Sequence, residues 1–146
     1  MGNKIKLLFI CGRNTARSQI AEAFLNSIGG DVFEAESAGL EPGAGVNPLA
    51  ANVMKEVDID ISANTVDSIM DFFREGRSYD YVIAVCDEAR AGTCPNFPGS
   101  HERLHWPFDD IGAFDGERDE MMGKARIVRD GIRAAVERFV AERRRG

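Results

Sequence analysis

The chain has 146 residues, of which 44% are hydrophobic and 29% are charged. These proportions are typical of a globular domain that can bury its own core, and they exclude a disordered tail or a fibrous repeat. Lys and Arg number 18 against 24 Asp and Glu, so the formal net charge of −6 argues against a nucleic-acid partner. No apolar run approaches the roughly 20 residues that span a bilayer, so no membrane insertion is expected. We expect residues 1–146 to form a single domain.

The three cysteines are an odd number and too few for a disulfide scaffold. The segment Lys4–Ile10 has a charged start, but its apolar stretch is short and lacks a small-residue cleavage site, so it predicts a strand instead of a signal peptide. We therefore expect a cytoplasmic protein whose thiols are reduced, and in which each cysteine either packs in the core or takes part in chemistry.

Continuous apolar runs alternate with helical spacings along the chain. The first run, Ile5–Ile10, is typical of a strand buried on both faces of a parallel sheet. Further strands are expected at 32–37, 79–85 and 104–106, and helices at 16–28, 48–57, about 65–73 and 116–143. This alternation predicts an α/β sandwich built on a parallel sheet.

Thr65 or Asp67 is expected to cap the third helix. In the last helix, Arg129 is expected on the solvated face, opposite one apolar stripe. That stripe comprises Met121, Ala125, Val128, Ile132, Ala135 and Phe139.

The segment Cys11–Ser18, which reads CGRNTARS, joins the first strand to the first helix. A cysteine, five residues and an arginine in this position can wrap backbone N–H groups around a tetrahedral oxyanion. Arg17 can hold two oxygens with its planar guanidinium, and the positive field favours a nucleophilic Cys11 thiolate. Ser18 can donate to that thiolate. The predicted oxyanion-binding residues are Gly12, Arg13, Asn14, Thr15, Ala16, Arg17 and Ser18.

An alternative interpretation is a buried cysteine at a tight turn, with Arg17 solvated. Against it, the segment resembles the phosphate loop of the low-molecular-weight protein tyrosine phosphatases and of the arsenate reductases that share their fold. Glu36–Leu40 is similar to the second strand and turn of that family. Three further segments, 46–48, 54–62 and 105–110, resemble its reductase branch. The resemblance implies a four-stranded parallel sheet flanked by helices on both faces.

Cys86 follows the third predicted strand, and Cys94 lies eight residues further on. The segment resembles the redox segment of thioredoxin-coupled arsenate reductases. The resemblance implies that Cys11 is the nucleophile, that Cys86 attacks the arsenic adduct, and that Cys94 closes a final disulfide with Cys86 for thioredoxin to reduce. The alternative is that Cys86 and Cys94 are packing residues in a phosphatase.

Asp110 is the candidate general acid, because the family places an aspartate after the last strand. Here Ile111 follows it in place of the usual proline, and a turn-capping role is the alternative. The family loop also has a glycine where this chain has Arg13. If that position needs positive φ, arginine is strained; otherwise Gly12 carries the requirement and Arg13 adds positive charge at the mouth.

Some reductases of the family bind a potassium ion beside the loop, and the matching residues here are Asn14, Glu22, Ser37 and Asp67, with Thr65 nearby. Each of them has a capping or solvated role as its alternative. No other cofactor is expected, because the cysteines and histidines lack metal-site spacing.

These observations predict a monomeric arsenate reductase that uses Cys11, Cys86 and Cys94 and is regenerated by thioredoxin. Phosphate and sulfate are expected to mimic arsenate, with weak phosphatase activity as a consequence. Two alternatives stay open: a phosphatase acting on phosphate monoesters, and a module that binds oxyanions without turnover. Against the phosphatase, Ile111–Phe114 offers one aromatic residue where the family typically has paired tyrosines.

Overall fold

The computed structural model describes residues 4–86, 97–99 and 102–144. Its strands are β1 (Ile5–Cys11), β2 (Phe33–Gly39), β3 (Tyr81–Ala84) and β4 (Glu102–His105). Its helices are α1 (Arg17–Gly29), α2 (Pro48–Lys55), α3 (Ile69–Arg74), the 3₁₀ helix η1 (Ile111–Ala113) and α5 (Arg118–Arg144). None of the described helices is both long enough and apolar enough to cross a membrane.

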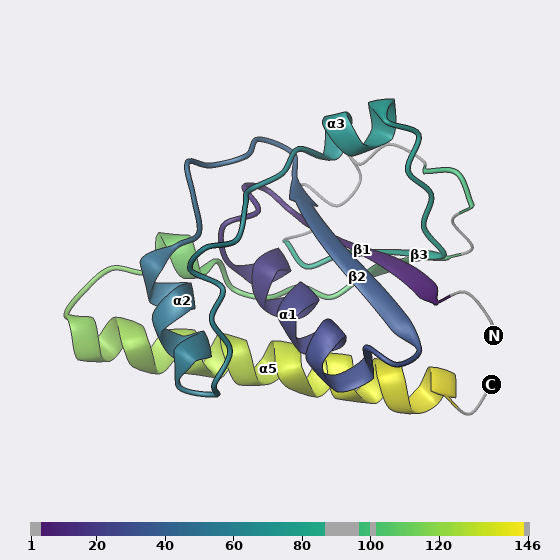
Figure 1. Cartoon of the computed structure of the whole chain (residues 1–146). Helices are drawn as coiled ribbons and strands as arrows, with labels where there is room; N and C mark the ends of the chain where they lie inside the picture. The colour runs from purple at the N-terminus through teal and green to yellow at the C-terminus, as the bar shows by residue number, and fades with distance from the viewer. Residues whose placement is uncertain (1–3, 87–96, 100–101, 145–146) are drawn as a thin grey trace.

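The four strands form one parallel sheet in the order β2-β1-β3-β4. Helices α1, α2 and α5 pack together on one side of the sheet, and α3 lies on the other side of β2 (Figure 1). Strand β1 is central, and its residues from Leu7 to Cys11 are buried, as expected for a strand covered on both faces. The predicted fold class is confirmed.

The register brings the carboxyl ends of three strands to one edge of the sheet. Cys11 at the end of β1 pairs with Gly39 at the end of β2, and Ile10 pairs with Ala84 of β3. The Val85 N–H donates to the Ile10 carbonyl at 2.9 Å, which extends the β1–β3 ladder by one residue. Ligands of open parallel sheets bind at this edge.

Strand β3 and the cap of α3 differ from the predicted ones. Strand β3 covers four residues instead of the predicted seven, although the Asp80 and Val85 N–H groups still donate to backbone carbonyls of β1. The cap of α3 is Ser68, whose Oγ accepts from the Asp71 N–H, and not Thr65 or Asp67. Asp67 cannot serve because its backbone N–H and carbonyl are bonded to Asn14 and Gly39, which holds it extended beside β2.

The apolar stripe of α5 is rotated slightly from its predicted position. Met122 and Val136 are buried, whereas Met121 and Ala135 are half-buried. Arg129, predicted on the solvated face, is only 8% exposed. Its Nη1 donates to the Val53 carbonyl at 2.9 Å and to Glu56 at 2.8 Å, so hydrogen bonds at the end of α2 compensate its burial.

Glu56 joins α2 to α5, and we expect this link to weaken in acid. Hydrogen bonds from Arg126 and then Arg129 hold the pKa of Glu56 at about 2, below its usual 4.5. A lowered folded-state pKa adds stability above pH 4.5 that is lost as the pH falls toward 2. Glu56→Gln should therefore lower the Tm at pH 7, and its deficit against wild type should shrink below pH 4.5. A deficit that is constant from pH 7 to pH 3 would contradict this linkage.

Candidate active site

The loop between β1 and α1 wraps around the sulfur of Cys11. Cys11 Sγ is buried, and two groups face it: the backbone N–H of Asn14 at 3.0 Å and the hydroxyl of Ser18 at 2.9 Å. Asn14 and Ser18 are themselves fully buried. Donors placed in this way stabilise a negatively charged sulfur.

The side chain of Asn14 sets the direction of these hydrogen bonds. Its Nδ2 donates to Ser18 Oγ at 2.8 Å, so the single hydroxyl proton of Ser18 is left to point at Cys11 Sγ. Asn14 Oδ1 accepts from the Asp67 N–H at 2.9 Å, which fixes the orientation of the amide. The loop therefore presents two donors to the sulfur before any ligand arrives.

The positive φ in this loop falls on Asn14, at 60°. Gly12 and Arg13 both have ordinary φ, so neither prediction about a glycine requirement at these positions holds. Asparagine is among the few residue types that adopt this conformation readily, and it turns the Asn14 N–H toward the sulfur. The conformation that was expected to need a glycine is thus provided by the residue after Arg13.

Strand β2 passes close behind the loop. A Cβ atom at Gly39 would lie 2.7 Å from the Arg13 carbonyl carbon and 2.8 Å from the Asn14 nitrogen, so only glycine fits here. The N–H groups of Leu40, Glu41 and Gly43 donate to carbonyls of the loop, at 3.1, 2.8 and 3.0 Å. The loop carbonyls therefore point outward to this segment, and the loop N–H groups are free to turn inward.

The loop forms part of the wall of a cavity of about 890 Å³. Arg17 and Arg13 contribute positive charge to its wall, and Glu41 and Asp110 contribute negative charge. Its other lining residues are Cys11, Gly12, Thr15, Ala16, Gly43, Ala44, Gly45, Val46, Asn47, Pro48, Gly112 and Ala113. The predicted nucleophile Cys11, the anion-binding Arg17 and the predicted acid Asp110 therefore line the same cavity.

Arg17 and Asp110 form an ion pair in the wall of this cavity. Arg17 Nη1 donates to the Phe108 carbonyl at 3.1 Å, and Nη2 lies 3.7 Å from Asp110 Oδ1. Asp110 is half exposed, and its Oδ1 also accepts from the Gly112 N–H at 2.9 Å as the N-cap of η1. Asp110 therefore caps η1 and is also the predicted general acid that lines the cavity. The neighbouring Asp109 does not line the cavity.

Cys86 lies at the same edge of the sheet as Cys11. It follows Val85, whose N–H is bonded to the residue before Cys11, and it is buried. Among the described residues, Cys86 is not one of those that line the cavity. Cys94, the third predicted relay thiol, lies outside the described residues.

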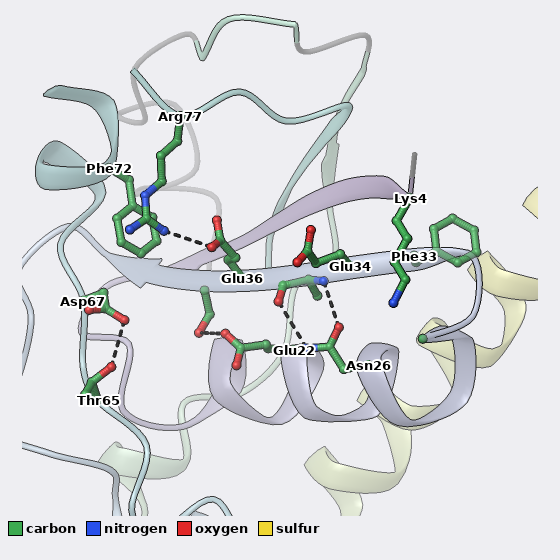
Figure 2. Close-up of a pocket in the computed structure, with 13 residues that line it drawn as sticks. Lys4, Glu22, Asn26, Phe33, Glu34, Glu36, Thr65, Asp67, Phe72 and Arg77 are labelled. Carbon is green, nitrogen blue, oxygen red and sulfur yellow. Dashed lines mark hydrogen bonds and ion pairs between the residues drawn. The ribbon is translucent and has the colours of Figure 1, made fainter. Parts of the chain in front are cut away.

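Three of the predicted potassium ligands line a separate pocket, shown in Figure 2. Ser37 Oγ donates to Glu22 Oε1 at 2.7 Å, and Thr65 Oγ1 donates to Asp67 Oδ2 at 3.2 Å. Burial raises the pKa of Glu22, and the nearby Glu36 and Asp67 carboxylates raise it further. Asn14 does not line this pocket but bonds the backbone of Asp67. Within the described part of the chain, no group of three or more His, Cys, Asp or Glu residues suits a metal ion.

Gln19 is a site residue that the sequence analysis missed. It is buried, and its Nε2 lies within hydrogen-bonding distance of the Asn14 carbonyl at 3.1 Å and the Thr65 carbonyl at 2.9 Å. It thereby ties the Cys11 loop to the segment before α3. A polar residue beside the apolar pair Ile20–Ala21 was the available signal in the sequence.

A buried cysteine sulfur under two hydrogen-bond donors, in one cavity with an arginine and a carboxylate at the end of a parallel strand, is the arrangement expected of a domain that binds oxyanions at a cysteine. Residues 6–139 match the family described as low molecular weight phosphotyrosine protein phosphatase, and the chain belongs to this family.

Relatives named arsenate reductase resemble this chain over nearly its whole length. An arsenate reductase of Halalkalibacterium halodurans is 39% identical over 137 residues, covering 94% of this chain and 96% of the relative. A solved arsenate reductase in the oxidized state has a TM-score of 0.78 and 31% identity, over 94% of this chain and 97% of that one. Another, in the phosphate binding state, has a TM-score of 0.73 and 33% identity, over 94% and 98%.

Proposed function

We propose that this protein reduces arsenate to arsenite with three thiols and is regenerated by thioredoxin. The observation that carries the proposal is the placement of Cys11 and Cys86 at the carboxyl end of neighbouring strands, with the Cys11 sulfur under two donors in the loop between β1 and α1. The similarity to arsenate reductases over nearly the whole chain supports it.

In the first step, arsenate occupies the loop, where inward N–H groups and Arg17 compensate its charge. The Cys11 thiolate attacks As(V) and forms a sulfur–arsenic bond. One arsenate oxygen leaves as water, with Asp110 supplying a proton. Arsenic remains As(V) at this stage, so the step parallels the formation of a cysteinyl phosphate.

In the second step, the Cys86 thiolate attacks Cys11 Sγ and forms a Cys11–Cys86 disulfide. The sulfur–arsenic bond breaks, and its electron pair stays on arsenic, which leaves as As(III) in arsenite. Cys94 then attacks Cys86, which frees Cys11 and leaves a Cys86–Cys94 disulfide. The dithiol of thioredoxin reduces that disulfide. The role of Cys94 comes from the sequence resemblance.

The assay that tests this proposal is arsenate-dependent oxidation of NADPH by the wild-type protein with thioredoxin and thioredoxin reductase. We expect multiple turnovers there and far fewer with glutathione and glutaredoxin, because an intramolecular Cys86–Cys94 disulfide suits a dithiol reductant. Equal rates with both systems would refute thioredoxin as the partner. The proposal includes a monomer acting in the reducing cytoplasm.

Slow hydrolysis of phosphate monoesters is a second activity that the loop supports. Phosphate and arsenate are tetrahedral oxyanions of similar charge, so the donors around Cys11 serve both, and sulfate is a further expected mimic. Arg17 and Asp110, which form an ion pair in the wall of the cavity, are the groups that a phosphoryl transfer needs. Their presence also favours an enzyme over a module that binds oxyanions without turnover.

We also propose that a potassium ion binds beside the loop, at Glu22, Ser37 and Asp67, with Asn14 connected to the site through the Asp67 N–H. Their oxygen atoms suit a hard cation, and a cation would offset the burial, and then the neighbouring Glu36 and Asp67 carboxylates, that raise the pKa of Glu22. The ion would supply electrostatic support to the loop through the Asp67–Asn14 hydrogen bond.

Potassium chloride should therefore raise the Tm by about 3 °C over choline chloride at equal ionic strength, which is roughly 1 kcal/mol for a domain of this size. Glu22→Gln should remove that difference. Glu34→Gln is the matched control, because Glu34 lines the same pocket but is exposed, and it should keep the difference. Loss of the difference in both variants, or in neither, would contradict a site at Glu22.

A further inference from the structure

The side chain of His105 holds the backbone of Cys86. His105 is the last residue of β4, and its Nε2 lies 2.6 Å from the Cys86 carbonyl oxygen. A carbonyl oxygen only accepts hydrogen bonds, so Nε2 carries the proton and donates it. The contact joins the edge strand of the sheet to the main chain of a buried cysteine.

This contact lies two residues beyond Ala84, which forms the last pair of the β3–β4 ladder. Ala84 pairs with His105 across β3 and β4, and the Trp106 N–H donates to the Ala84 carbonyl at 2.7 Å. On the other side, the Val85 N–H donates to Ile10 of β1. At Cys86, one residue further, the His105 side chain also bonds the main chain to β4.

We propose that His105 is a positioning residue for the second step of arsenate reduction. By fixing the Cys86 carbonyl to β4, it restricts the main chain just beyond β3, whose other side is bonded to β1 through the Val85 N–H. The Cys86 thiol is thereby kept at the carboxyl end of the sheet where Cys11 lies. The inference rests on the proposed thiol relay, in which Cys86 attacks Cys11 Sγ and the electron pair of the sulfur–arsenic bond stays on arsenic. His105 itself exchanges neither a proton nor an electron in that step.

Two amide substitutions separate this hydrogen bond from the rest of the side chain. In His105→Gln the amide nitrogen reaches about as far as imidazole Nε2, so it can still donate to the Cys86 carbonyl. In His105→Asn the side chain is one methylene shorter and falls short of that oxygen. The two variants are otherwise alike in charge and polarity, so a difference between them reports on the contact.

The measurement is the rate of arsenite release in a single turnover without thioredoxin, which requires Cys11 and Cys86 alone. We expect His105→Asn to be slower than wild type by about tenfold, as for loss of one buried hydrogen bond, and His105→Gln to stay within about threefold. Binding of inorganic phosphate should be unchanged in both, because the loop around Cys11 is intact. Equal rates in the two variants would overturn the proposal.

A chemical readout tests the same contact without arsenate. Iodoacetamide should alkylate Cys86 about tenfold faster in folded His105→Asn than in wild type or His105→Gln, with Cys11 unaffected. An unchanged rate at Cys86 would overturn the positioning role. Cys86→Ser in the single-turnover assay separates the two hypotheses: release at the wild-type rate refutes the relay itself, whereas loss of release together with a wild-type rate in His105→Asn refutes only the role of His105.

Discussion

Serine at position 86 or 94 should abolish multiple turnover of arsenate with thioredoxin, as completely as serine at position 11. The three variants should nevertheless stop at different points. Cys11→Ser cannot form the sulfur–arsenic bond, and Cys86→Ser forms it but has no thiol to displace arsenite. Cys94→Ser should release about one equivalent of arsenite and stop as the Cys11–Cys86 disulfide.

These stopping points follow from the structure around the first thiol. The donors that face Cys11 Sγ come from Asn14 and Ser18, so they are unaffected by changes at positions 86 and 94. Inorganic phosphate should therefore bind Cys86→Ser and Cys94→Ser as tightly as wild type, which is the control for folding. Arsenite is measured after rapid mixing, and the disulfide by mass spectrometry of the stopped protein.

Wild-type turnover in Cys86→Ser and Cys94→Ser, with only Cys11→Ser inactive, would refute the relay. The phosphatase interpretation would then be favoured, because it requires Cys11 alone. On that interpretation, wild type and Cys86→Ser should hydrolyse p-nitrophenyl phosphate at equal rates.

Arg17→Lys should lower arsenate turnover by about 10²–10³-fold, although the positive charge is retained. The guanidinium is only 10% exposed, and it is oriented by the Phe108 carbonyl and by Asp110. Lysine offers a point charge on a flexible chain, so it cannot present two parallel N–H groups to an oxyanion. The loss should appear in the affinity for inorganic phosphate as well as in turnover.

Arg133→Lys is the matched control for this experiment. Arg133 lies on α5 and is about half exposed, and among the described residues its ion-pair partner is Glu137, at 3.9 Å. It does not line the cavity, so the same chemical change there should leave turnover within about twofold of wild type, as is usual for surface sites. Similar losses in both variants would show that Arg17 acts through stability and not by holding the anion.

Much of the site was predictable because its residues are neighbours in the chain. The apolar run before Cys11 and the helical spacing after Ala16 place a strand-to-helix turn at residues 11–17, and such a turn positions its own N–H groups. The order of strands and helices likewise follows from local periodicity, and with it the parallel sheet. The resemblance to the phosphatase family then supplied the acid and the two further thiols.

Other features depend on contacts between residues far apart in the sequence. Arg17 is oriented by a carbonyl 91 residues away, and the burial of Arg129 is compensated by a hydrogen bond that it donates to a carbonyl 76 residues away. The stripe of α5 was misplaced by one residue because Met121 and Met122 are equally apolar, and only packing against α1 and α2 decides which of them is buried.

The amino-acid sequence by itself determined the Cys11 loop and the alternation of strands and helices, since hydrophobic period and turn chemistry act over a few residues. Tertiary structure decided the rest: that Asn14 carries the positive φ, that Gln19 braces the loop, and that His105 holds Cys86. These depend on which strands become neighbours in the sheet. Parallel pairing brings together segments separated by long connections, whose side chains have no local signal of their partners.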